Sequence, residues 1–232
     1  MTKKTAVVTG ARSGIGKSIT ERLLTMGFHV IGISRTITAA DINHIDFLPL
    51  QCDLSQSNNI SKQCQVLMGN ATISLLVNAA GFGRFEPHEA LSSHTIEAMT
   101  AVNLTAPMIL SNLLLRTLKT NEGTIINITS IEAVRSSKFS ALYSATKAGL
   151  RAFGHSLFEE VRKSGVNIVT LNPDMTDTDF FKPLRFGVSD RDDSRLISND
   201  IADAVEQILT MRKGASITEM TIRPQRFGII KK

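Results

Sequence analysis

Short runs of β-branched and aliphatic residues alternate with longer segments of helical periodicity along almost the whole chain. This alternation is typical of parallel strands joined by helical crossovers, because a parallel pair cannot be connected by a tight turn. The strand-like segments are 5–10, 28–34, 47–53, 73–81, 123–130, 166–173 and 216–224. The sequence therefore predicts an α/β fold of the Rossmann type, a doubly wound parallel sheet of about seven strands with helices on both faces.

Helical patterns fill the intervals between these strands. They cover 16–27, a weakly marked 55–69, 93–119, 141–164 and 200–211, the last with Asp200 as its expected cap. Residues 174–198 have no clean period and contain Pro183 and Gly187, so we expect a mobile loop there, with at most one short helix. Because no repeat or linker interrupts the series, residues 1–232 are expected to form a single domain.

The charge of the chain is mildly basic and unevenly distributed. Lys and Arg number 26 against 21 Asp and Glu, and between residues 1 and 35 only Glu21 opposes six basic residues. No dense Lys/Arg run with interleaved aromatic residues occurs and Trp is absent, which disfavours nucleic acid as a partner.

The N-terminal apolar run, Ala6–Val8, is too short for a signal peptide, and nowhere do eighteen apolar residues run together. Cys52 and Cys64 are too few and too widely spaced for a zinc site or a redox pair, and the five His show no metal-ligand spacing. We therefore expect a cytoplasmic protein without a metal, and no membrane partner.

The glycine-rich segment TGARSGIG, residues 9–16, joins the first strand to the first helix. Gly10 permits a sharp turn, Gly14 lets the backbone approach a pyrophosphate, and Gly16 lets the helix pack closely on the sheet. The spacing differs from the common G-x-G-x-x-G, and an ordinary tight turn is the alternative. The residues expected to bind a dinucleotide here are Gly10, Arg12, Ser13, Gly14, Ile15 and Gly16.

Ser34 and Arg35 end the second strand, where an acidic residue would bind the adenosine ribose of NAD. Arg35 can pair with a 2′-phosphate, and no carboxylate stands beside it in the sequence. This favours NADP over NAD, although a solvated basic face formed by Arg12 and Arg35 is the alternative.

The only tyrosine, Tyr143, stands four residues before Lys147 in the segment YSATK. This spacing puts both side chains on one helix face, where an ammonium group favours the phenolate. Bringing a tyrosine pKa from 10 to neutrality requires about 4 kcal/mol. Tyr143 can then exchange a proton with a carbonyl or hydroxyl oxygen as general acid/base, unless it is merely a core residue.

In this context the chain resembles the short-chain dehydrogenase/reductases, in their single-domain branch. The resemblance spans nearly the whole chain and rests on motifs in the right order: TGARSGIG, CDL at 52–54, NAAG at 78–81, Asn103, Ser130 and Tyr143-x-x-x-Lys147. It implies that Asp53 and Leu54 flank the adenine and that Asn78, Ala79, Ala80 and Gly81 lie beside the cofactor.

The resemblance also implies a catalytic tetrad of Asn103, Ser130, Tyr143 and Lys147. Ser130 would hydrogen-bond the substrate oxygen and stabilise developing negative charge. Asn103 would hold an ordered water and link Lys147 to solvent, and Lys147 would bind the nicotinamide ribose. Taken singly, Ser130 could be a strand-end cap and Asn103 a helix-bending residue.

The segment NPDMTDT, residues 172–178, resembles the family pattern N-P-G-x-V-x-T that binds the nicotinamide carboxamide. It keeps Pro173 and Thr178, while Asp174 replaces the glycine and Thr176 the aliphatic residue, which can still act through its backbone. The Asp174 carboxylate could face either the substrate or the solvent.

We expect residues 174–198 to roof the substrate pocket with apolar side chains, among them Phe180, Phe181, Leu184 and Phe186. Glu132, two residues after Ser130, could contact a polar or cationic substrate group, or could be an ordinary packing residue.

The expected function is an NADP-dependent oxidoreductase that interconverts a carbonyl and an alcohol in a small molecule. A non-catalytic NADP-binding sensor of the same fold and a sugar-nucleotide epimerase are the rival hypotheses, and the tetrad and the glycine spacing argue against them. The helices 93–119 and 141–164 are expected to form a homodimer or homotetramer interface, as in relatives.

Overall fold

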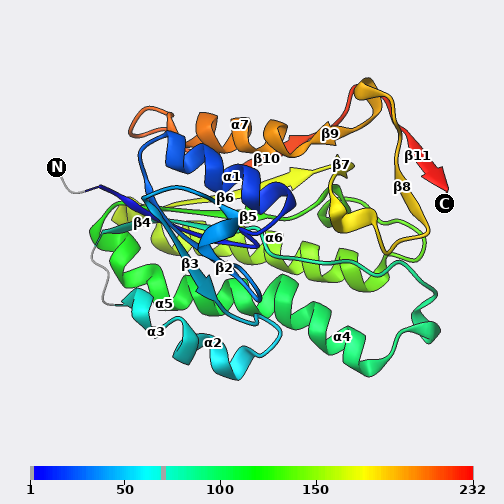
Figure 1. The fold of residues 1–232 in the computed structure, drawn as a ribbon, viewed down its shortest axis with the longest axis horizontal. Coiled ribbons are helices and arrows are strands. Elements are labelled where there is room, and N and C mark those ends of the chain that lie inside the picture. Colours follow the sequence, from blue (N-terminus) through cyan, green and yellow to red (C-terminus); the bar gives the residue numbers. More distant parts are fainter. Residues whose placement is uncertain (1–2, 69–71, 232) are drawn as a thin grey trace.

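A seven-stranded parallel sheet forms the centre of the molecule (Figure 1). The computed structural model describes residues 3–68 and 72–231. The strands of the sheet are β1 (Thr5–Thr9), β2 (His29–Ser34), β3 (Phe47–Gln51), β4 (Ile73–Asn78), β5 (Thr124–Ile128), β6 (Asn167–Pro173) and β10 (Glu219–Ile222). Their order is β10-β6-β5-β4-β1-β2-β3 with every pair parallel, which confirms the Rossmann-type fold. Because the winding reverses between β1 and β4, a binding crevice is expected at their carboxyl ends.

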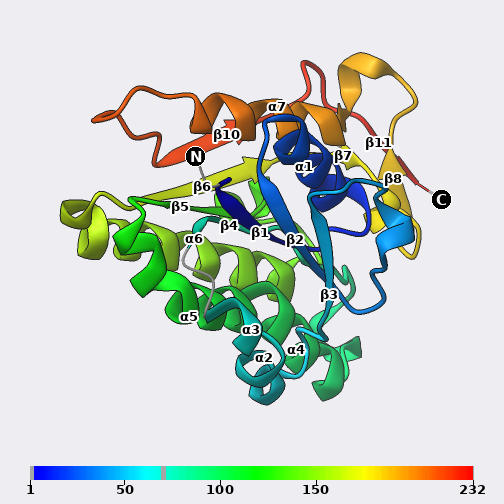
Figure 2. The same ribbon diagram turned by 60° about the vertical axis from the view of Figure 1, so that its left-hand side comes forward.

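Helices cover both faces of this sheet (Figure 2). One face carries α1 (Gly14–Thr25) and α7 (Ser198–Leu209). The other carries α2 (Ser57–Gln63), α3 (Gln65–Met68), α4 (Ser93–Thr100), α5 (Ala106–Thr120) and α6 (Ala141–Val161). Successive side chains of β1 point to opposite faces of the sheet and so contribute to both helix layers. Ala6 and Val8 pack toward α1 and α7, whereas Val7 packs toward α5.

The helices differ from the sequence prediction in two places. The segment 93–119 is broken by a π-helical turn, Ala101–Thr105, which separates α4 from α5. In addition, α7 begins at Ser198, so Asp200 lies in its first turn and accepts a hydrogen bond from the Ile197 N–H at 2.8 Å. Asp200 therefore stabilises the start of the helix from within and is not the cap residue.

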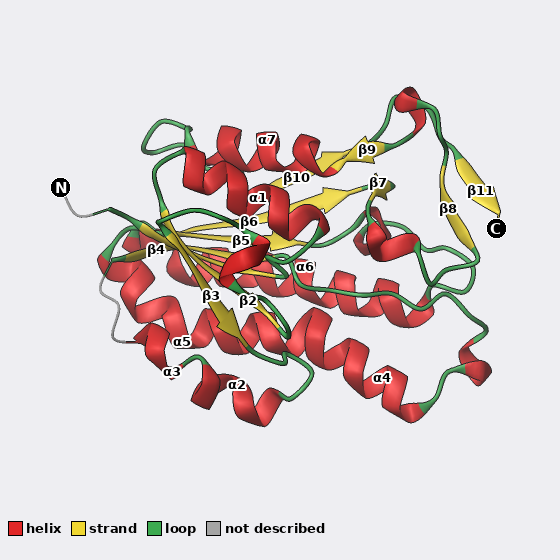
Figure 3. Ribbon diagram, viewed as in Figure 1, coloured by secondary structure: helices red, strands yellow, loops and turns green. Residues whose placement is uncertain are grey.

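The region after β6 contains several short elements, and not one irregular loop (Figure 3). Strand β7 (Thr176–Asp177) pairs with β9 (Leu196–Ile197), and β8 (Phe186–Val188) pairs antiparallel with β11 (Ile229–Lys231). Single turns of 3-10 helix lie at Ala39–Asp41, His88–Ala90, Ile131–Ala133, Arg162–Ser164, Asp179–Phe181 and Asp192–Ser194.

The two cysteines lie against each other although twelve residues separate them in the sequence. The Sγ atoms of Cys52 and Cys64 are 4.0 Å apart, and both are buried free thiols. Their separation in the sequence therefore does not keep them apart in the fold, because α2 folds back onto the end of β3.

The stretch Ser93–Thr120 is long and apolar enough to cross a membrane. Its inward face, which includes Leu110, Leu114 and Leu118, belongs to the core below the sheet. Core helices of globular proteins share such a composition, so length and apolarity alone do not make this stretch a membrane span.

Candidate active site

The glycine-rich turn packs against the segment that follows β4. Gly10 has φ +70°, and a Cβ there would lie 3.0 Å from the Ala80 Cα. The N–H groups of Ala79 and Ala80 both donate to Thr9 Oγ1 at 3.0 Å. The two segments therefore form one continuous wall at the reversal point of the sheet.

The remaining glycines bring the start of α1 close to its neighbours. A Cβ on Gly16 would lie 2.3 Å from the Gly10 carbonyl oxygen, a distance that excludes any side chain. Gly14 has φ +53°, and its Cβ would meet Thr178 Cγ2 at 3.3 Å, so the segment after β6 also reaches this turn. Within the described chain, the N-cap Ser13 makes no side-chain capping bond, and the first N–H groups of α1, including that of Ile15, are therefore available to a bound anion.

The end of β2 presents an unpaired guanidinium group. Arg35 is exposed and forms no hydrogen bond or ion pair with any described residue, and it follows the half-buried Ser34. Arg12 is bound to the Thr36 hydroxyl at 2.8 Å and to Asp41 at 3.1 Å. Asp41 was not expected near Arg12, and the turn at 39–41 brings it there.

The hydrogen bond from the Thr38 backbone, followed by that from Arg12, holds the pKa of Asp41 below its usual range. Asp41 is therefore a carboxylate that neutralises Arg12, which leaves Arg35 as the uncompensated charge at this edge.

Two further predicted cofactor segments lie along the same crevice. Asp53 accepts hydrogen bonds from the N–H and hydroxyl of Ser55 at 3.0 and 2.8 Å, and Leu54 beside it is buried. Asn78 is buried and donates to Asn127 Oδ1 at 2.9 Å, which braces β4 against β5. Gly81 follows Asn78, and a Cβ there would meet both Asn103 Oδ1 and Lys147 Nζ at 3.2 Å.

Asn103 is fully buried in the π-helical turn. Its Nδ2 donates to the Phe82 carbonyl at 2.9 Å and to Thr146 Oγ1 at 3.1 Å, and its Oδ1 accepts from the Phe82 N–H at 3.1 Å. These bonds join the helix layer to the segment after β4 and to α6. They also stabilise the geometry of the turn, since the oxygen and both N–H groups of the Asn103 side chain are hydrogen-bonded.

Tyr143, Ser130 and Lys147 meet at the carboxyl end of β5. Ser130 follows β5, and its side chain lies beside that of Tyr143, where hydrogen bonding acts to lower the tyrosine pKa. Tyr143 is buried on α6, and Lys147, one turn later, is also buried and donates to the Ile128 carbonyl at 2.9 Å. The Lys147 Nζ lies 5.9 Å from the centre of the tyrosine ring. The structure thus brings together all four residues of the predicted tetrad.

The electrostatics of this cluster differ from the sequence expectation. Burial raises the pKa of Tyr143 to about 12. Hydrogen bonding by Ser130 acts to lower this pKa, and the negative charge of Glu132 raises it by a smaller amount. Burial also lowers the pKa of Lys147 to about 8. The expected lowering of the tyrosine pKa by the lysine is absent because desolvation of both groups dominates.

The segment after β6 is held by Asp174, whose side chain is 1% exposed. Its Oδ1 accepts from the Met175 N–H at 2.9 Å, and its Oδ2 accepts from Arg223 Nε at 2.9 Å. The carboxylate is therefore a buried partner of arginine and does not face the solvent.

The remaining predicted residues of this segment are Pro173, which is buried at the end of β6, and the two threonines. Thr176 donates to the Asp174 carbonyl at 3.0 Å, and Thr178 caps the turn at 179–181. Together they lead the chain from the sheet edge to the glycine turn.

An aromatic cluster covers Tyr143. Its ring centre lies 5.2 Å from that of Phe85 and 5.7 Å from that of Phe180. Phe181 and Phe186 extend the cluster, with Leu184 beside them. The loop residues expected to roof the site therefore do pack over it, whereas Phe139 is 45% exposed.

Glu132 does not face a free space in which a substrate could bind. It is buried, and each carboxylate oxygen accepts two hydrogen bonds from neighbouring side chains. Arg135, the partner of Glu132, and Arg223, the partner of Asp174, were not recognised from the sequence. The available signal was that buried carboxylates, such as one replacing the glycine at 174, require a cationic partner.

No group of three or more His, Cys, Asp or Glu side chains that could hold a metal ion occurs in residues 3–68 and 72–231. The fold and the site together define a class of protein, the nucleotide-binding oxidoreductases of the Rossmann type.

Comparison with known proteins specifies the family. The model of the short chain dehydrogenase family matches residues 4–189, and the chain belongs to this family. An uncharacterized oxidoreductase of Staphylococcus epidermidis is 30% identical over 230 residues, which are 96% of this chain and 97% of that protein.

Two solved structures share the fold. A metagenomic short-chain oxidoreductase in complex with NADP is 29% identical, with a TM-score of 0.80 and coverage of 95% of this chain and 97% of that one. An alcohol dehydrogenase from the archaeon Thermococcus sibiricus, complexed with 5-hydroxy-NADP, has a TM-score of 0.86 at 24% identity, with coverage of 96% and 97%.

Proposed function

We propose that this protein is an NADP-dependent oxidoreductase that interconverts a ketone or aldehyde and the corresponding alcohol, with Tyr143 as general acid/base. The observation that carries the proposal is that buried Tyr143 lies beside Ser130 at the sheet edge, one helical turn from buried Lys147. A protein that only binds the cofactor has no need of this buried acid/base group.

The residues proposed to hold the cofactor form the continuous wall described above. The glycine positions fit this role, because side chains at Gly10 and Gly16 would collide with backbone and the open helix start faces the crevice. When bound, the nicotinamide supplies or accepts the hydride. The proposed cofactor residues are Gly10, Arg12, Ser13, Gly14, Ile15, Gly16, Ser34, Arg35, Asp53, Leu54, Asn78, Ala79, Ala80, Gly81, Tyr143, Lys147, Pro173, Thr176 and Thr178.

The high pKa of Tyr143 suits one direction of the reaction. A phenol with a pKa of about 12 is protonated at neutral pH and can donate a proton to a carbonyl oxygen. Ser130 donates a hydrogen bond to the same oxygen, and Lys147 supports the supply of protons from solvent. The Asn103 side chain fixes the π-helical turn beside Lys147 through its bonds to Phe82 and Thr146. Alcohol oxidation requires the phenolate, so its rate should rise with pH.

The test of catalysis is Tyr143→Phe, which removes the hydroxyl and keeps the ring between Phe85 and Phe180. With a library of carbonyl compounds, NADPH absorbance should show turnover by the wild type and at least a 100-fold lower rate in the variant. Fluorescence titration should give nearly unchanged NADPH affinity. Retained turnover in the variant contradicts the role of Tyr143, and NADPH binding without turnover of any compound by the wild type supports the sensor hypothesis.

The preference for NADP is tested with Arg35→Ala. The exposed, unpaired guanidinium can pair with the 2′-phosphate, so its loss should weaken NADP binding by about tenfold or more and leave NAD binding within about twofold. Arg212→Ala, on another exposed surface, is the matched control. Equal losses for the two cofactors would remove Arg35 as the discriminating residue.

We further propose a soluble cytoplasmic enzyme made of a single domain, in which residues 174–198 close over a small-molecule substrate. The partners implied are that substrate and further copies of the same chain.

A further inference from the structure

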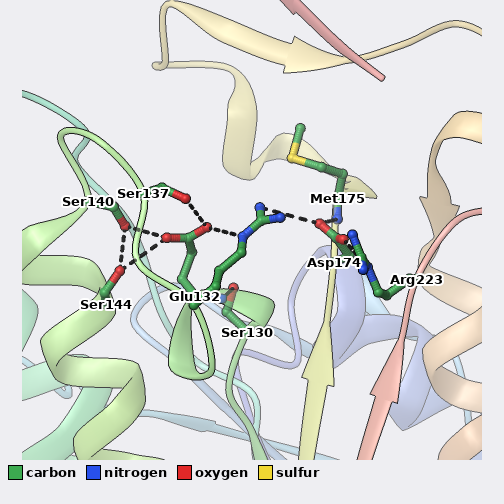
Figure 4. A network of polar contacts seen from close by, with 9 residues as sticks. Ser130, Glu132, Ser137, Ser140, Ser144, Asp174, Met175 and Arg223 are labelled. Atoms are coloured by element: carbon green, nitrogen blue, oxygen red, sulfur yellow. Dashed lines mark hydrogen bonds and ion pairs between the residues drawn. The ribbon is translucent and has the colours of Figure 1, made fainter. Parts of the chain in front are cut away.

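A buried carboxylate joins the two segments that carry Ser130 and Tyr143. Glu132 Oε1 accepts from Arg135 Nε and from Ser137 Oγ, both at 2.8 Å. Its Oε2 accepts from Ser140 Oγ at 2.9 Å and from Ser144 Oγ at 3.1 Å. Figure 4 shows the three serines and the arginine side chain converging on this one group.

The first segment is the turn after β5. The Glu132 N–H donates to Ser130 Oγ at 3.2 Å, and Ser130 is the N-cap of the 3-10 turn Ile131–Ala133. The orientation of the Ser130 hydroxyl therefore depends on where the backbone of Glu132 lies.

The second segment is the beginning of α6. Ser140 is the N-cap of this helix, and Ser144 directly follows Tyr143. By binding both serine hydroxyls, the Glu132 carboxylate fixes the first turn of α6 against the turn that holds Ser130. One side chain therefore sets the distance between the Ser130 and Tyr143 hydroxyls.

The network continues across the carboxyl ends of two further strands. Arg135 Nη2 lies 3.8 Å from Asp174 Oδ1, after β6, and Arg223 Nε, after β10, lies 2.9 Å from Asp174 Oδ2. Two guanidinium groups thus compensate two carboxylates, and Figure 4 shows Ser130 beneath this row. Because the charges of these four side chains already balance, Glu132 does not require a cationic substrate group as its partner. This argues against Glu132 as a substrate contact.

From these contacts we infer that Glu132 is a positioning residue, which holds Ser130 and Tyr143 in register for proton transfer without touching the substrate. Burial of ion pairs gives little net stability compared with well-packed apolar residues, so a network of this kind is better explained by the geometry it imposes. The inference rests on the proposed function, because it assigns to Glu132 a role in that same proton transfer.

The positioning role is tested with Glu132→Ala, which removes all four hydrogen bonds of the carboxylate. Displacement of a catalytic group by about 1 Å can cost 100-fold in rate, so kcat should fall by about 10- to 100-fold. The affinity for NADPH should stay within about twofold, since the glycine turn is not contacted. Glu89→Gln changes an exposed carboxylate and should leave kcat as in the wild type.

Glu132→Gln separates geometry from charge. The glutamine oxygen can still accept from Arg135 and Ser137, and its amide can donate to Ser140 and Ser144, because hydroxyl groups also accept. Most of kcat should therefore be recovered relative to Glu132→Ala.

The pH profile provides a readout that a purely structural role would not move. The Glu132 charge raises the pKa of Tyr143, so its neutralisation should lower that pKa. The rise of the alcohol-oxidation rate with pH should then begin at lower pH in Glu132→Gln than in the wild type. The other charged groups around this site are Arg135, Asp174, Arg223 and Lys147, and all are kept in the variant.

Three outcomes are informative. Wild-type kcat in a folded Glu132→Ala protein overturns the inference, as does an unshifted pH profile in Glu132→Gln. If Glu132→Ala fails to fold, Ser140→Ala with Ser144→Ala removes only the bonds to α6 and must give the same loss of kcat. If Tyr143→Phe is inactive but the Glu132 variants match the wild type, only this inference fails, whereas turnover by Tyr143→Phe refutes the proposed function itself.

Discussion

Lys147 illustrates how a site residue can be unfavourable for stability. It is 4% exposed, and burial lowers its pKa from the ordinary 10.5 to about 8. This difference corresponds to about 3 kcal/mol of destabilisation of the charged form at neutral pH. The hydrogen bond to the Ile128 carbonyl recovers about 1 kcal/mol of it. A buried lysine at this position is therefore explained by binding or chemistry better than by packing.

We predict that Lys147→Met increases the free energy of unfolding by about 2 kcal/mol at pH 7, the difference between these two effects, while abolishing turnover. Urea denaturation measures the first effect and NADPH absorbance the second. Lys163→Met, at an exposed position, should change the free energy of unfolding by no more than about 0.5 kcal/mol. A destabilised Lys147→Met protein would show that packing and the Ile128 bond outweigh desolvation.

The increase in the free energy of unfolding caused by Lys147→Met should also depend on pH. The unfolded chain keeps the lysine proton up to about pH 10.5, whereas folded Lys147 releases it near pH 8. Between these values the unfolded state binds more protons, so the wild type becomes more stable as the pH rises. The advantage of the variant should therefore be largest below pH 8 and should shrink toward pH 10.

The pair Tyr143 and Lys147 could be predicted because its four-residue interval carries the signal, whereas Ser130 and Asn103 followed only from the resemblance to the family. The role of Asp174 could not be predicted in this way. Its partner Arg223 lies 49 residues later, on the far side of α7 in the chain, and only strand order brings the two together. The pKa values also depended on three-dimensional burial, which the spacing does not determine.

At the scale of elements, periodicity predicted the long strands and helices but not their interruptions. The segment 93–119 reads as one helix because its apolar face continues through both halves, yet the chain widens to a π-helical turn at Asn103. Tertiary hydrogen bonds to Phe82 and Thr146 stabilise that turn. A polar residue in an apolar helical face was the one signal available from the sequence.

The short strands after β6 were not predicted for a similar reason. Strand β8 gains its partner from β11 at the other end of the chain, with Gly187 opposite Ile230. The Arg226 N–H also donates to the Asp193 carbonyl at 2.7 Å. The last residues therefore hold the segment that places Phe186 against Phe85, the neighbour of Tyr143, a relation that no local pattern encodes.

At the scale of the whole molecule, the order of the strands in the sheet follows from general rules of chain connection and could be predicted from the sequence. Right-handed crossovers between parallel strands, together with a glycine turn at the first junction, leave few arrangements other than the observed one. These rules do not determine how copies of the chain associate, because association depends on the surface that the fold leaves exposed.

The outer face of the α4 to α6 layer is the candidate for such association. Only 39% of the residues in the most apolar stretch of Ser93–Thr120 are buried, although its composition is that of a core helix. Apolar helix surface in water is a typical site of subunit contact, and twofold association would cover the same face on both copies. We therefore predict a homodimer or homotetramer that uses this layer.

Light scattering at micromolar concentration should give a mass of two or four times the 25.3 kDa monomer. Asn112 is exposed on α5, so Asn112→Glu places a charge on this face without disturbing the core, and repulsion between symmetry-related copies should shift the mass toward the monomer. Asn58→Glu, on the exposed side of α2, is the matched control and should keep the wild-type mass. A monomeric wild type would contradict the prediction, and an unchanged mass in Asn112→Glu would place the subunit contact on another face.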